Sequence, residues 1–182
     1  YIPATSFAGI IRHYAEKYLK VDGDTESIYN RFWGFTKNQN GLQSSLYISD
    51  MYLSGDAKIK IRDGVRIDNK TGIVEDTGKF DYEVIEPGPT TDFNMELSIK
   101  NSQDEKPFKE ILKSILAIIR SGKIQLGAKT NNGFGKIEMK ELQVCEYDFT
   151  KNQDVINFLN KKLIDNNPLD KIFELKDTNR YF

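Results

Sequence analysis

The chain of 182 residues has little of what disulfide or metal chemistry needs, with one cysteine, Cys145, and one histidine, His13. A single thiol excludes an internal disulfide framework and a cysteine-rich zinc site, and it is typical of a reducing compartment. A single imidazole excludes a multi-histidine metal centre. No apolar run approaches about 18 residues, which excludes a transmembrane helix, so we expect no membrane partner.

The chain also has no excess charge of one sign. Lys and Arg number 26 against 27 Asp and Glu, giving a net charge of −1, which excludes a histone-like polycation. The charge is unevenly distributed, however. Between Lys106 and Lys140, eight basic residues accompany two acidic ones, a local charge of +6. This asymmetry favours contact with a polyanion, although an ordinary solvated helix face and strand edge would have the same composition.

Apolar residues at helical spacing predict two main helices. The first begins with Thr5 or Ser6 as its N-cap, because a hydroxyl can accept an unpaired amide hydrogen there. The second spans 106–120, with Pro107 in its first turn, where a missing N–H is tolerated. Gly122 follows as the residue that ends this helix.

Alternation of apolar and polar residues predicts a half-buried antiparallel sheet, because period two places one face in the core and the other in water. Its strands are 46–51, 58–62, 80–84 and 93–99. Turn residues between the second and third predict a long projecting hairpin over about 58–80. Two further short strands are expected at 123–126 and 136–144, on either side of a glycine-rich loop.

This order of elements is that of an α+β, ferredoxin-like fold whose first strand is missing. We expect that strand upstream of Tyr1 or from another segment, because the chain opens on a helix and lacks an initiator methionine. Residues 1–149 are interpreted as one ferredoxin-like domain with a hairpin insertion. Residues 150–182 are interpreted as a partly helical C-terminal extension.

The loop of sequence GAKTNNGFG is the first candidate site. Its glycines permit positive φ angles and close backbone approach, and successive amide hydrogens in such a loop can bind an anion. The loop is neither a Walker motif nor a dinucleotide fingerprint, since it lacks Gly-Lys-Ser/Thr and joins strand to strand. A strand connection with no ligand remains the alternative. The candidate RNA-binding residues are Lys129, Thr130, Asn131, Asn132, Gly133, Phe134, Gly135 and Lys136.

The hairpin and the first helix carry further candidates. Arg62 and Arg66 lie among apolar residues of the hairpin, a pattern that suits an RNA backbone or an ordinary surface hairpin with nearby acids. The start of the first helix offers amide hydrogens to a phosphate, which Ser6 and Arg12 would help to hold. His13 is a candidate general base for RNA cleavage, although an exposed histidine without such a role is the simpler interpretation.

Five segments carry a family resemblance in a consistent order: YIPATSFAG with Ile11 and Arg12; Phe32-Trp33-Gly34; residues 64–72; residues 80–88; and LGAKTNNGFGKI at 126–137. Together they resemble the RAMP superfamily of CRISPR-associated proteins, in particular the backbone subunits of type III (Csm/Cmr-like) effector complexes. Ala4 and Ala8 stand where the family has glycine and lysine. This shifts the expected phosphate contacts toward Ser6, Arg12 and the glycine loop.

The resemblance implies a modified ferredoxin-like (RRM-like) fold that holds a guide RNA (crRNA), with a thumb-like hairpin inserted in the guide–target duplex. It implies complementary target RNA and other RAMP subunits as partners, antiviral defence as the role and the prokaryotic cytoplasm as the location. Target-cutting members use an aspartate before the Ile-Pro motif and a divalent metal such as Mg²⁺. That position precedes Tyr1, so endoribonuclease activity stays open, as does a ferredoxin-like interaction module without RNA.

Overall fold

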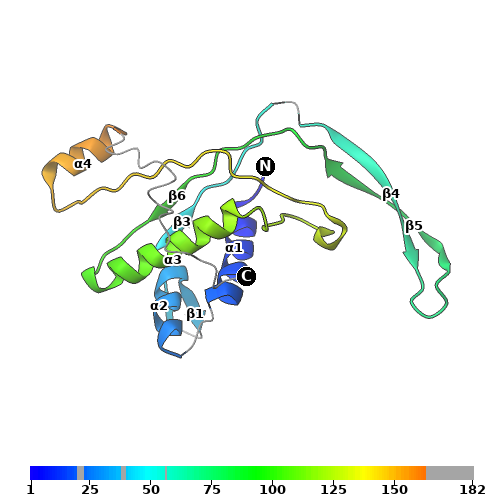
Figure 1. Cartoon of the computed structure of the whole chain (residues 1–182), viewed down its shortest axis with the longest axis horizontal. Helices are drawn as coiled ribbons and strands as arrows, with labels where there is room; N and C mark the ends of the chain where they lie inside the picture. The colour runs from blue at the N-terminus through cyan, green and yellow to red at the C-terminus, as the bar shows by residue number, and fades with distance from the viewer. Residues whose placement is uncertain (20–22, 38–39, 56, 163–182) are drawn as a thin grey trace. The chain divides into compact units, whose positions relative to one another are not determined.

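The computed structural model describes residues 1–19, 23–37, 40–55 and 57–162 (Figure 1). The chain divides into two compact units. One consists of Tyr1–Thr5 with Ile48–Met95, and the other of Ser6–Tyr47 with Glu96–Phe182. Each unit is described on its own below.

The larger unit is mainly helical. Its helices are α1 (Ala4–Leu19, whose first residues belong to the other unit), α2 (Gly23–Trp33), α3 (Ser102–Arg120) and α4 (Asn152–Leu159). The predicted apolar stripe of α3 is confirmed, and it forms the core together with buried side chains of α1 and α2. The core residues of these helices are Phe7, Ile11, Ala15, Tyr29, Phe32, Trp33, Phe108, Ile111, Ile115, Leu116 and Ile119.

Aromatic and ionic contacts join α2 to α3. The rings of Phe32 and Phe108 meet edge to face, with centroids 5.3 Å apart. Beside them the guanidinium of Arg31 donates two hydrogen bonds to one carboxylate oxygen of Asp104, at 2.7 and 3.1 Å. Asp104 is only 6 % exposed, so the arginine supplies the countercharge that a buried carboxylate requires.

The first residues of α1 and α3 differ from the predicted ones. Neither Thr5 nor Ser6 caps α1, because the helix begins at Ala4, whose amide donates to the carboxylate of Asp50 at 2.7 Å. Pro107 lies inside α3 and not in its first turn, since the helix starts at Ser102. The expected stop at Gly122 is confirmed, with a φ of +66°.

Within the described ranges, the strands form three two-stranded sheets and not one half-buried sheet, which corrects the prediction. In one sheet β1 (Phe35–Lys37) pairs with β2 (Asn40–Leu42); in another, β3 (Leu46–Ile48) pairs with β6 (Met95–Leu97). The third is the predicted hairpin, in which β4 (Ile59–Ile67) runs antiparallel to β5 (Val74–Ile85) (Figure 1). Ile59 and Ile61 on one face are 63 % and 64 % exposed, and Phe80 on the other face is 40 % exposed, so the alternating residues here form a ribbon with both faces exposed to solvent.

The strands expected around the glycine loop are also corrected. Among the described residues, 123–126 and 136–144 share a single antiparallel bridge, between Gln125 and Lys136. The segment after Lys136 leaves this pairing and runs to α4, the helix expected in the C-terminal extension. The rest of that extension, from residue 163, lies outside the described residues.

The ion pair between the buried carboxylate of Asp104 and the partly exposed guanidinium of Arg31 predicts a pH-dependent loss of stability. Arg31 holds the pKa of Asp104 below its ordinary value, chiefly through its hydrogen bonds. The pair therefore stabilises the fold above the unfolded pKa of about 3.9, and this contribution is lost as pH falls through the folded pKa. We expect Asp104→Asn to lower the free energy of unfolding at pH 7 by about 1–3 kcal/mol.

Urea unfolding of the wild type and the variant between pH 2 and 7 measures this effect. The difference between the two proteins should shrink toward the acid end. Asp92→Asn, a change at an exposed aspartate, is the matched control and should change stability little. A constant difference across the whole pH range would contradict the assignment.

Candidate nucleic-acid interface

The glycine loop is closed at its base by a narrow neck. The amide of Leu126 donates to the carbonyl of Gly135 at 2.8 Å. The side-chain amide of Gln125, which precedes the neck, donates to the carbonyls of Thr130 and Phe134, both at 3.1 Å. One glutamine side chain thus holds both arms of the loop, so that its backbone is ordered without an apolar core of its own.

Within the loop the backbone makes one tight turn. Residues Thr130–Asn132 form a 3₁₀ turn, flanked by Lys129 and Gly133 in the left-handed region with φ of 59° and 85°. The amides of Asn132 and Gly133 donate to the carbonyls of Lys129 and Thr130 at 2.9 Å. The turn therefore satisfies its own hydrogen bonds and leaves its outer side chains to other partners.

Gly135 is required for a second reason besides its φ of +77°. A β-carbon at this position would overlap the carbonyl oxygen of Leu126, because the two backbones pass each other at the neck. Gly127 has a similar φ, +81°, but no atom lies within 4 Å of where its β-carbon would be. The sequence alone does not distinguish these two glycines.

The loop presents donors and no acid to solvent. Asn131, Asn132 and Gly133 are exposed, whereas Lys129, Thr130, Phe134 and Gly135 are half-buried. Lys136 is exposed and forms no ion pair with any described residue. Since no acidic residue occurs from Gly127 to Lys136, the surface combines amide donors with a cation. That combination suits a phosphate group.

Helix α1 carries the next two candidates. Ser6 is exposed in the first turn, and Arg12 is half-buried. The Arg12 guanidinium lies 3.5 Å from a carboxylate oxygen of Glu16 and 5.9 Å from the centre of the Tyr29 ring. The hydroxyl of Tyr29 donates to the Arg12 carbonyl at 2.8 Å, and burial raises the pKa of this tyrosine so that it stays a donor.

The helix start is less open to an anion than the sequence predicts. Asp50 accepts the amide hydrogen of Ala4, so that amide is not available to a phosphate. The carboxylate also places negative charge at the helix end, where the dipole would otherwise favour a phosphate. Farther along α1, the hydroxyl of Tyr14 donates to the Lys123 carbonyl at 3.2 Å, which joins the helix to the segment that leads into the glycine loop.

The hairpin candidates, Arg62 and Arg66, belong to the smaller unit. Arg62 is exposed and lies opposite Tyr82 in the antiparallel register. Arg66 forms a loose ion pair with Glu75 at 3.6 Å. The turn is built around Asp68, whose carboxylate accepts hydrogen bonds from Thr71 and Lys70; these hold its pKa below the ordinary value.

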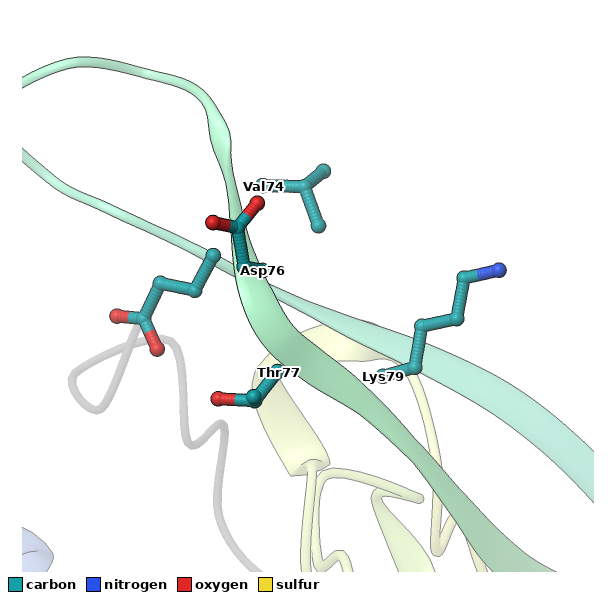
Figure 2. Close-up of a pocket in the computed structure, with 5 residues that line it drawn as sticks. Val74, Asp76, Thr77 and Lys79 are labelled. Atoms are coloured by element: carbon teal, nitrogen blue, oxygen red, sulfur yellow. The ribbon is translucent and has the colours of Figure 1, made fainter.

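A hollow on β5, lined by Val74, Glu75, Asp76, Thr77 and Lys79, has side chains spread along the strand and not aimed at one point (Figure 2).

No group of three or more His, Cys, Asp or Glu residues could hold a metal in the part of the chain that is described. None of the described helices is both long and apolar enough to span a membrane. His13 is exposed and contacts the ring of Tyr14 edge-on.

The helices and small antiparallel sheets make this an α+β protein, and comparison with known proteins identifies its family. The family model for the RAMP superfamily matches residues 1–138. This match covers more than half of the chain, which therefore belongs to the RAMP superfamily. Both the predicted family and the predicted α+β RAMP fold are confirmed.

One solved structure shows the similarity in three dimensions. The chain is similar to a chain in the cryo-EM structure of the Type III-B Cmr-beta bound to cognate target RNA, with a TM-score of 0.51 and 21 % sequence identity. The match covers 77 % of this chain and 45 % of that one, so this chain spans less than half of the neighbour's length. A search of curated proteins finds no match.

The neck geometry predicts that two glycine substitutions differ. Gly135→Ala and Gly127→Ala both place a β-carbon at positive φ, which costs about 1–2 kcal/mol. Only Gly135→Ala adds the overlap with Leu126. We expect Gly135→Ala to open the neck and speed hydrogen exchange at the Leu126 amide at least tenfold, with Gly127→Ala nearer the wild type. Equal exchange rates in the two variants would contradict this account of the neck.

Proposed function

We propose that this chain is an RNA-binding subunit, or a segment of one, in a type III CRISPR effector complex, and that its glycine loop holds the backbone of a guide RNA. The observation that carries the proposal is the exposed, acid-free loop with two asparagine amides and the cation of Lys136. Membership of the RAMP superfamily and the fold similarity to a chain of an RNA-bound Cmr complex support it.

The chemistry of the loop fits a guide better than a specific target sequence. Amide hydrogens and ammonium groups contact phosphate oxygens, which are the same for every nucleotide. A guide scaffold has to accept any spacer, so backbone contacts give affinity without a preference for sequence. Because the net charge of the whole chain is close to zero, the electrostatic attraction for RNA comes from the cations at the loop. Other RAMP subunits and a complementary target RNA would complete the assembly.

Removal of the loop cations tests the proposal. In the double variant Lys129→Ala/Lys136→Ala we expect weaker binding of a labelled single-stranded RNA, measured by fluorescence anisotropy over a series of KCl concentrations. Each lost phosphate contact should reduce the slope of log K against log salt by about 0.7, or about 1.4 for both. Two RNAs of unrelated sequence should give the same affinities.

The matched control is Lys151→Ala/Lys162→Ala, which removes the same charge from two exposed lysines outside the loop. It should leave the slope close to that of the wild type. The proposal is wrong if the wild-type chain binds no RNA, or if the loop variant keeps the slope of the wild type. Equal slopes in the two double variants would assign the attraction to net charge and not to the loop.

A further inference from the structure

The segment of residues 137–148, which we call the strap, runs from the glycine loop to α4 (Figure 1). It forms neither a helix nor a strand. From 137 to 142 its backbone makes no hydrogen bond with the backbone of another described residue. Its half-buried apolar side chains are Ile137, Met139, Leu142 and Val144. The strap is therefore attached through side chains and not through a backbone ladder.

An ion cluster joins the strap to α3. The ammonium of Lys109 lies 2.9 Å from a carboxylate oxygen of Glu105, one turn earlier in the helix, and 2.6 Å from one of Glu146 in the strap. The hydrogen bonds that Lys109 donates to these two carboxylates raise its pKa, so the ammonium stays charged. Glu105 has the i,i+4 spacing, so it restricts the lysine side chain independently of the strap. We call these three residues the Lys109 cluster.

The end of the strap has no other polar link to this helix. In the described part of the chain, no further ion pair or hydrogen bond connects residues 144–162 with α3. Helix α4 packs instead around the end of the strap, where the Phe158 ring meets those of Tyr147 and Phe149 at centroid distances of 5.3 and 5.1 Å. The hydroxyl of Tyr147 also donates to the carbonyl of Lys162 at 3.0 Å. Residues 147–162 thus hold one another without the help of α3.

We infer that the Lys109 cluster closes the strap on α3 and that salt opens it, so that the strap and α4 exchange between an attached and a released form. An isolated exposed ion pair contributes little, because two long side chains lose freedom when they pair. Here Glu105 already restricts Lys109, so less freedom is lost when Glu146 binds. The Glu146 side chain is 73 % exposed, and dissolved ions therefore screen its contact with Lys109.

The chain carries a natural reporter of this exchange. Its single cysteine, Cys145, lies beside Glu146 in the strap and is half-buried. Alkylation by uncharged iodoacetamide, followed by mass spectrometry, measures how readily local opening exposes the thiol. In low salt we expect Lys109→Gln and Glu146→Gln to react about threefold faster than the wild type, as the loss of one favourable ion pair requires. Added KCl should accelerate the wild type and leave both variants nearly unchanged.

The two substitutions also separate release of the strap from a direct effect of charge on the thiol. A carboxylate near a thiol disfavours the reactive thiolate, whereas an ammonium favours it. Electrostatics alone would therefore make Glu146→Gln faster and Lys109→Gln slower. Such opposite changes would overturn the inference, which requires that both variants react faster.

Lys113→Gln is the matched control. Lys113 is exposed one turn farther along α3 and forms no ion pair with any described residue, so the same loss of charge there should leave the rate unchanged. The exchanged pair Lys109→Glu/Glu146→Lys places the ammonium on the strap and the carboxylates on the helix, and it should restore the slow rate. Failure of this restoration, or equal rates for Lys109→Gln and Lys113→Gln, would contradict the role of the cluster.

Urea unfolding excludes a trivial cause of faster alkylation. The attachment of the strap is a local equilibrium, so the unfolding midpoint of Lys109→Gln should equal that of Lys113→Gln. A lower midpoint for Lys109→Gln that accounts for its whole increase in rate would assign the effect to global unfolding and overturn the inference. None of these measurements depends on RNA, and the proposed function is therefore tested separately.

Discussion

The packing of α3 against α2 is the contact on which the larger unit depends. Phe108 and Phe32 meet at its centre, and the Arg31–Asp104 pair fixes the two helices beside them. Ile119 near the end of α3 and Ile124 just after the Gly122 turn are both buried, at 2 % and 0 % exposed. The turn is therefore anchored on both sides, and the chain enters the glycine loop from a fixed position.

The loop itself is built almost entirely from backbone. Its neck depends on the absence of a side chain at Gly135, and its arms are held by one glutamine, Gln125. The turn uses the backbone amides of Asn132 and Gly133 for its own hydrogen bonds, so the donors that it offers to solvent are side chains. These few hydrogen bonds order the loop and leave the side chains of Asn131, Asn132 and Lys136 exposed.

The hairpin is stabilised differently from the larger unit, because it has no core of its own. A two-stranded ribbon is marginally stable by itself, and here it is supported by the Asp68 turn and by the ring of Phe80 across Gly64. Both faces of a two-stranded ribbon are exposed to solvent. Alternation of residues along its strands therefore produces two different exposed surfaces, instead of one buried face and one exposed face. One surface can then be basic and aromatic while the other is acidic and aliphatic.

The sequence by itself determined α1, α3, the hairpin, the stop at Gly122 and the family, because each depends on the spacing of nearby residues or on a short motif. It did not reveal α2 or the β1–β2 pair, and no local pattern reports the Asp50 cap on α1, 46 residues away, or the Arg31–Asp104 pair, 73 residues apart. Only the tertiary structure decided that the alternating hairpin is open on both sides and that Gly135 has no room for a side chain. The reason is physical: periodicity tells which residues share a face, whereas what covers that face depends on distant parts of the chain.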